Sequence, residues 1–185
     1  SNPDETGQTV VEFFRSKEGE SEYWPDNEKL KESIVDLPYW GRINQRRLKM
    51  VFRALERELR KEGFSETREI TETLHIEHIL PREWAHNWSL PGIQPEEVER
   101  MERDKMKHTF GNLTVLTEKL NSSVSNASWD VKQEKIHDHS VLTLNKELIK
   151  KWPDRWNEET IKERGLELAK VVVEVWPEPD SSYWD

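Results

Sequence analysis

Residues 74–81, LHIEHILP, carry two histidines and a glutamate in an alternating pattern typical of a half-buried strand. Residues two apart on a strand share a face, which puts His75 with Glu77. His78 points away from them unless the strand bends, and Pro81 just after it favours an irregular strand end. A carboxylate is a hard ligand for Mg²⁺ or Mn²⁺, and a neutral imidazole can take a proton from water. This stretch therefore predicts metal binding or proton transfer.

A second polar pair lies downstream in GNLTVLTEKLN. Asn112 occupies the turn before a predicted strand, where an asparagine can bind neighbouring backbone groups and stiffen a loop. Asn121 follows nine residues later, one turn into the next helix. If that helix start faces the first strand, Asn121 offers an uncharged oxygen to a metal ion.

These residues must be positioned by a mainly α chain with a small two-stranded antiparallel sheet. Apolar residues at three- and four-residue spacing, capping residues and breakers predict the helices, and β-branched and leucine-rich runs predict the strands. The helices are expected at 26–36, 43–62, 95–107, 118–126, 128–139, 145–152 and 157–176, and the strands at 73–80 and 113–117.

Composition excludes several classes of protein. The chain has no cysteine, so it forms no disulfide and no thiolate zinc site. The chain has no run of about 18 apolar residues, which is the length needed to span a membrane. The net charge of −9 argues against coating nucleic acid by bulk attraction, although residues 42–61 carry eight basic and two acidic residues. The chain opens SNPDETGQ without a methionine, and we expect it to be part of a larger protein.

The order strand, long connection, strand, short helix, with His78, Asn112 and Asn121 at these positions, resembles the ββα-metal finger of HNH nucleases. More narrowly, IEHILP, GNLTVLTEKLNSSVSN and ELAKVVVEVW are similar to the C-terminal nuclease domain of GmrSD-type, modification-dependent restriction endonucleases and related phage-defence effectors. The resemblance covers about residues 70–176.

The resemblance implies a role for each residue of the motif. His78 would be the general base that activates water for attack on a phosphate. Glu77 and Asn121 would hold one divalent cation, Mg²⁺ or Mn²⁺, and Asn112 would brace the loop that orients the histidine. For His75 three roles stay open, namely a second metal ligand, a phosphate contact or a support.

The resemblance also implies a domain organisation, with an HNH ββα-metal finger embedded in a helical domain. The expected parts are a polar N-terminal segment at 1–25, a helical part at 26–70, the ββα-metal core with a helical insertion at 71–140, C-terminal helices at 141–176 and a tail at 177–185. The expected function is hydrolysis of DNA in the cytoplasm of a prokaryote. Target choice would lie with an N-terminal nucleotide-hydrolysing domain of the same protein.

Two other functions stay open at this stage. The chain could cleave RNA, because the chemistry does not require a particular sugar. It could also be a non-enzymatic module that binds a partner protein.

Several further residues have alternative interpretations. Basic residues flanking the site or lining the long helix could contact phosphates, or they could be solvated; these are Lys119, Lys132, Arg46 and Arg47, with Lys49 and Arg53 beside them. His137 and His139 could hold a metal, but a solvated helix end is favoured. His86 is expected in an aromatic cluster, and His108 is expected to pack or cap, with a phosphate contact as the alternative.

Overall fold

A computed structural model of the chain describes residues 25–61 and 72–178. Within them, helices dominate and two short strands form one sheet, which confirms the predicted mainly α architecture with a two-stranded antiparallel sheet. The elements, in order, are α2 (Asn27–Asp36), α3 (Gln45–Lys61), β1 (Leu74–His78), the 3₁₀ turn η1 (Trp84–His86), α4 (Glu96–Met106), the 3₁₀ turn η2 (Phe110–Asn112), β2 (Leu113–Thr117), α5 (Glu118–Val124), α6 (Trp129–His139), α7 (Thr143–Lys151) and α8 (Glu158–Val175).

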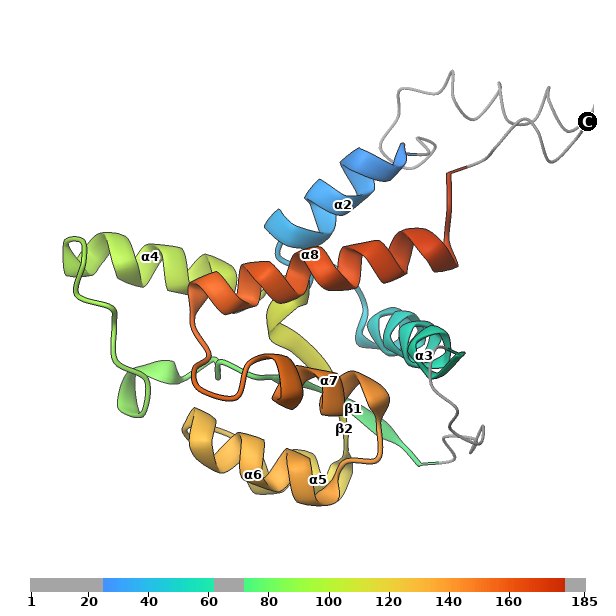
Figure 1. Cartoon of the computed structure of the whole chain (residues 1–185). Helices are drawn as coiled ribbons and strands as arrows, with labels where there is room; N and C mark the ends of the chain where they lie inside the picture. The colour runs from blue at the N-terminus through green and yellow to red at the C-terminus, as the bar shows by residue number, and fades with distance from the viewer. Residues whose placement is uncertain (1–24, 62–71, 179–185) are drawn as a thin grey trace, which may run out of the picture.

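The two strands lie side by side and contact α3 and α5 (Figure 1). β1 pairs with β2 in an antiparallel register that sets Leu74 opposite Thr117 and His78 opposite Leu113. α5 begins directly after β2, and α4 lies in the connection between the strands. The end of β1 that carries His78 therefore meets the start of β2, while the start of β1 lies beside the last residue before α5.

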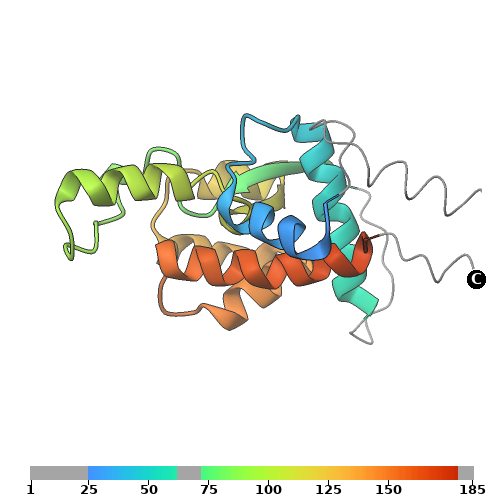
Figure 2. The same cartoon turned by 90° about the horizontal axis from the view of Figure 1, so that it is seen from above.

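Helices cover both faces of the sheet. Ile76 and Val115 belong to a core cluster with Phe52 of α3 and Val172 of α8, and α2 packs along α8 (Figures 1 and 2). Leu116 belongs to a second cluster with residues of α5 and α6. The expected half-buried strand is wrong in one respect, because Glu77 and His78 are both buried and His75 alone among the polar residues of β1 is partly exposed. α5 and α6 cover the face that carries Glu77, and Trp40 packs on His78.

Local sequence signals explain most helix boundaries, and one long-range contact explains why the predicted start of α7 is wrong. Asp26 caps α2 by accepting a hydrogen bond from the Lys29 amide at 2.8 Å, as its position predicts. The sequence predicts that α7 starts at Asn145, but it starts at Thr143. The reason is Glu56 of α3, whose carboxylate accepts from the amides of Thr143 and Leu144 at 2.9 and 2.8 Å and so caps the helix from a distance.

The predicted N-terminal segment and most of the predicted tail lie outside the described residues. Glu178, near the start of that tail, is tied to the first residue of α2: its amide donates to Asn27 Oδ1 and its carboxylate accepts from the Asn27 amide. Among the described helices, none has the length and apolar character that crossing a bilayer requires.

The turn before β2 packs against α8 through a glycine. A Cβ atom placed on Gly111 would lie 2.1 Å from the carbonyl oxygen of Ile161, so only glycine fits this contact. Gly165, one turn later on α8, is not restricted in this way, because a Cβ there would have its nearest neighbour, Val35 Cα, at 3.6 Å. The close approach brings η2 and β2 onto α8.

We expect Gly111→Ala to lower the free energy of unfolding by about 3 kcal/mol, because the methyl group must displace helical backbone. Gly165→Ala is the matched control and should leave stability unchanged or raise it by up to about 1 kcal/mol, since alanine favours a helix interior. Urea unfolding followed by circular dichroism measures both. Equal stabilities of the two variants would contradict the proposed packing constraint.

Candidate active site

His78 ends β1 and is buried, with only 6% of its surface exposed. Trp40 packs edge-on against its ring at a centroid distance of 4.7 Å, and its Nε2 lies 3.3 Å from Nδ1 of His108. Burial, with further contributions from His108 and Arg82, lowers the pKa of His78 to about 3, since a charged ring is disfavoured in this position. The imidazole is therefore neutral at physiological pH.

Glu77 lies on the other face of the strand and forms a buried ion pair with Lys132 of α6. The Lys132 ammonium donates to Glu77 Oε1 at 2.5 Å and to the carbonyl oxygen of His78 at 2.7 Å. Burial raises the pKa of Glu77, and the neighbouring ammonium partly offsets this effect. Burial lowers the pKa of Lys132, against the pull of the carboxylate. The ion pair fixes the orientation of the Glu77 carboxylate.

Asn112 is fully buried and joins three segments of the chain. Its Oδ1 accepts from the Leu80 amide at 2.8 Å and from Trp156 Nε1 at 2.9 Å. Its Nδ2 donates to the carbonyl oxygens of Leu80 and Lys107 at 2.9 and 2.8 Å. Both functions of the amide are thus used to hold the segment that follows His78.

Arg164 of α8 reinforces this turn. Its Nη1 donates to the carbonyl oxygens of Gly111 and Leu113, at 2.6 and 2.8 Å, on either side of Asn112. Complete burial lowers the pKa of Arg164 to about 9. The two side chains together fix the backbone from which β2 starts.

Asn121 and His75 each contain a buried polar atom without a hydrogen-bond partner in the described part of the chain. These atoms are Asn121 Oδ1 and His75 Nε2. α5, which carries Asn121, packs against both strands. A buried acceptor without a donor is costly and rare in proteins, so Asn121 Oδ1 fits a group that supplies positive charge.

The donor set fits a hard divalent cation in kind, since it consists of a carboxylate and an amide oxygen. No group of three or more His, Cys, Asp or Glu side chains suited to a metal lies within residues 25–61 and 72–178. His137 and His139 belong to that described part and are both exposed at the end of α6. A cation would therefore need the uncharged oxygen of Asn121 besides Glu77.

His108 packs edge-on against the His78 ring at a centroid distance of 5.4 Å, which agrees with the packing role that the sequence favoured. Besides the contact with His78, its carbonyl oxygen accepts from the amides of Tyr39 and Trp40 at 2.8 and 3.3 Å. It thereby positions the tryptophan that packs on His78. His108 lies thirty residues after His78 in the chain, so no local sequence signal indicated this contact.

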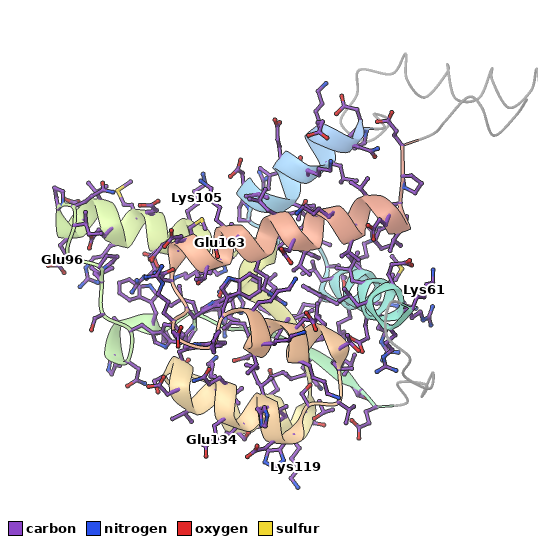
Figure 3. All side chains as sticks on the ribbon, viewed as in Figure 1. Lys61, Glu96, Lys105, Lys119, Glu134 and Glu163 are labelled. Carbon is purple, nitrogen blue, oxygen red and sulfur yellow. The ribbon has the colours of Figure 1, made fainter. Side chains whose placement is uncertain are left out.

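The basic residues expected near nucleic acid occupy three different environments. Lys119 is exposed and projects outward from α5 (Figure 3). Arg46 and Arg47 are exposed in the first turn of α3. Lys132 does not reach the surface at all, because its ammonium pairs with Glu77, and the expectation that it meets a phosphate does not fit this buried position.

A hollow of about 430 Å³ between α3, α7 and α8 lies apart from these residues. Leu148, Lys151 and Glu167 are among its walls, and none of the residues that the sequence predicts for the site lines it. The residues that the sequence predicts for the site therefore lie apart from this hollow.

Comparison with known proteins places these features in a family. A family model described as "GmrSD restriction endonucleases, C-terminal domain" matches residues 24–171. This range contains the sheet, the residues around His78 and all the described helices up to most of α8. No curated protein and no solved structure matches the chain.

We expect Asn112→Ala to lower the free energy of unfolding by about 4 kcal/mol, because it leaves the buried Leu80 amide and the Trp156 indole N–H unpaired. Asn121→Ala is the matched control and should cost about 1 kcal/mol or less, since it removes an acceptor that has no partner among the described residues. Chemical denaturation of both variants measures the difference. A large loss for Asn121 with a small one for Asn112 would reverse the assignment.

The buried His78 predicts a pH dependence of stability. Its folded pKa of about 3 lies below the ordinary value of 6.5, so the unfolded chain binds the proton more readily. The contribution of neutral His78 to the free energy of unfolding is fully present above pH 6.5. It is lost as the pH falls toward 3, by up to about 1.4 kcal/mol per pH unit. When the pH falls from about 7.5 to about 5.0, the free energy of unfolding of His78→Gln should therefore decrease by about 2 kcal/mol less than that of the wild type.

Urea unfolding at the two pH values tests this expectation. His139→Gln is the control, because it changes an exposed histidine and leaves the buried imidazole in place. It should keep the wild-type difference. A His78→Gln variant that loses as much stability as the wild type would show that His78 does not resist protonation in the folded protein.

Proposed function

The chain belongs to the family formed by the C-terminal domains of GmrSD restriction endonucleases, and we propose that it hydrolyses DNA phosphodiester bonds with a divalent metal ion, as an HNH nuclease. A restriction endonuclease domain of this family acts on DNA. The observation that carries the more specific proposal is the buried pair of neighbours Glu77 and His78 at the end of β1, next to a β2–α5 unit that contains Asn121. In this proposal β1, β2 and α5 are the ββα-metal finger.

His78 is the general base. Its neutral imidazole takes a proton from a water molecule, whose oxygen then forms a bond to phosphorus while the bond from phosphorus to the leaving 3′-oxygen breaks. The leaving oxygen receives a proton from solvent. Trp40 and His108 hold the imidazole ring in place, and Asn112 keeps the backbone after His78 in the position that this reaction requires.

Glu77 and Asn121 are the protein ligands of the cation, which would be Mg²⁺ or Mn²⁺. When bound, such an ion neutralises charge on the phosphate and on the leaving oxygen. Asn121 Oδ1 is a buried oxygen without a hydrogen-bond partner in the described structure. Lys132 keeps the carboxylate ionised and oriented. His75 supports the site, as a second ligand, a phosphate contact or a structural residue.

The surroundings of the site suit an effector that depends on a second domain for its target. Lys119, Arg46 and Arg47 are exposed and can meet phosphates, but the net charge of −9 limits autonomous binding. We assign target choice to an N-terminal nucleotide-hydrolysing domain of the same protein, in the cytoplasm of a prokaryote, as part of anti-phage restriction.

A nicking assay on supercoiled plasmid with Mg²⁺ or Mn²⁺ tests the proposal. We expect His78→Ala to lower the cleavage rate by about 10² to 10⁴, which is the usual contribution of a general base. Asn121→Ala should need a higher metal concentration for the same rate. His139→Ala and Asn126→Ala are matched controls at exposed positions and should cleave like the wild type.

The same assay decides between the alternatives. Cleavage of matched RNA but not of plasmid would make the chain a ribonuclease. Absence of cleavage with either nucleic acid and either metal would favour a non-enzymatic module. Wild-type activity in a folded His78→Ala variant would remove His78 from the role of base.

A further inference from the structure

An open groove of about 390 Å³ lies between α3 and residues 72–74, where the chain enters β1. Its α3 wall carries four cations, Arg46, Lys49, Arg53 and Arg57, and its other wall is residues 72–74. The cations recur at spacings of three and four residues, so they form one stripe on the helix, with Met50 and Ala54 between them. We call this set of four residues the α3 stripe.

The α3 stripe is not neutralised within the described protein. In the part of the chain that the structure describes, none of its four cations pairs with a carboxylate, and Arg53 donates only to the backbone oxygen of Glu72 at 3.2 Å. The next basic residues of the helix behave differently, since Arg60 pairs with Glu56 and Lys61 with Glu58. Glu72 is the single acidic residue among the described residues that line the groove. Cations at these spacings repel one another, so the stripe favours an external anion.

We propose that the α3 stripe binds the phosphate backbone of the nucleic acid at a distance from the bond that is cut, an inference that rests on the proposed function. From Arg46 to Arg57 the helix rises by about 16 Å. That length corresponds to about five nucleotides of one DNA strand, at about 3.4 Å each. A regular row of cations matches a repeating anion, and the groove offers no large apolar pocket that would anchor a protein partner.

The position of the groove relative to His78 supports this inference. Leu74 lines the groove and His78 ends the same strand four residues later, about 13 Å away. Figure 2 shows β1 leading away from the N-terminal half of α3. Trp40, which packs on His78, lies under the Arg82 guanidinium at 5.7 Å. A DNA strand held by the α3 stripe can therefore extend toward His78, where Arg82 offers a further positive charge.

Fluorescence anisotropy of a labelled duplex DNA, measured in EDTA at several salt concentrations, tests the proposal without cleavage. The stripe variant replaces Arg46, Lys49, Arg53 and Arg57 with glutamine. The control variant makes the same replacement at Lys105, Lys146, Lys162 and Lys170, which are exposed on other helices, and lowers the net charge equally. We expect the dissociation constant of the stripe variant to rise at least about tenfold, and the slope of its salt dependence to fall by about 0.9 for each phosphate that the variant no longer neutralises.

The remaining arms make every outcome informative. A variant with Arg46→Lys, Arg53→Lys and Arg57→Lys keeps the charge and should bind DNA like the wild type, which separates the effect of charge from an effect on folding. Polyglutamate serves as a second anionic probe that is not a nucleic acid. Equal weakening of DNA binding in the stripe and control variants would overturn the proposal. A stripe variant that loses binding to polyglutamate but keeps binding to DNA would also overturn it. His78→Ala should bind DNA with the wild-type dissociation constant. If the wild-type protein binds DNA through the α3 stripe but never cleaves it, the proposed function is refuted and the binding proposal stands.

Discussion

The buried amide of Asn112 is the interaction on which the arrangement of the site depends. It satisfies both the N–H and the carbonyl group of Leu80, just after β1, and also bonds the end of α4 and the indole of Trp156. Each of these groups would be costly to bury unpaired. Because β1 and β2 are only five residues long, their ladder alone could not fix the segment after His78, and this side chain provides the additional constraint.

Much of the fold could be predicted from the sequence because its signals are local. Helix periodicity, the Asp26 cap and the turn at Gly111 and Asn112 indicated the elements and their order. What could not be predicted depends on contacts across many residues. Glu56 sets the start of α7 from 87 residues away, and Lys132 reaches Glu77 from 55 residues away. A lysine in a charged helix is normally expected at the surface, so its burial had no local signal.

The candidate site shows the same division. Strand alternation predicted that His78 points away from Glu77, and the two side chains do have different partners. Sequence spacing could not show that both faces of the strand are covered, since this needs α3, α5, α6 and α8 to be in place. Coverage changes the chemistry of the strand, because burial lowers the pKa of His78 and raises that of Glu77.

Although the protein is acidic overall, several basic side chains lie close to the candidate site. Arg82, Lys107 and Lys132 all disfavour protonation of His78, and Arg82 also stacks on Trp40 near the same ring. In the proposed reaction these charges have two consistent effects: they keep the base unprotonated, and those at the surface attract the phosphate that the base requires. In the same proposal, the α3 stripe extends this attraction along the bound DNA strand. The net charge of −9 would oppose DNA binding at the other surfaces of the protein.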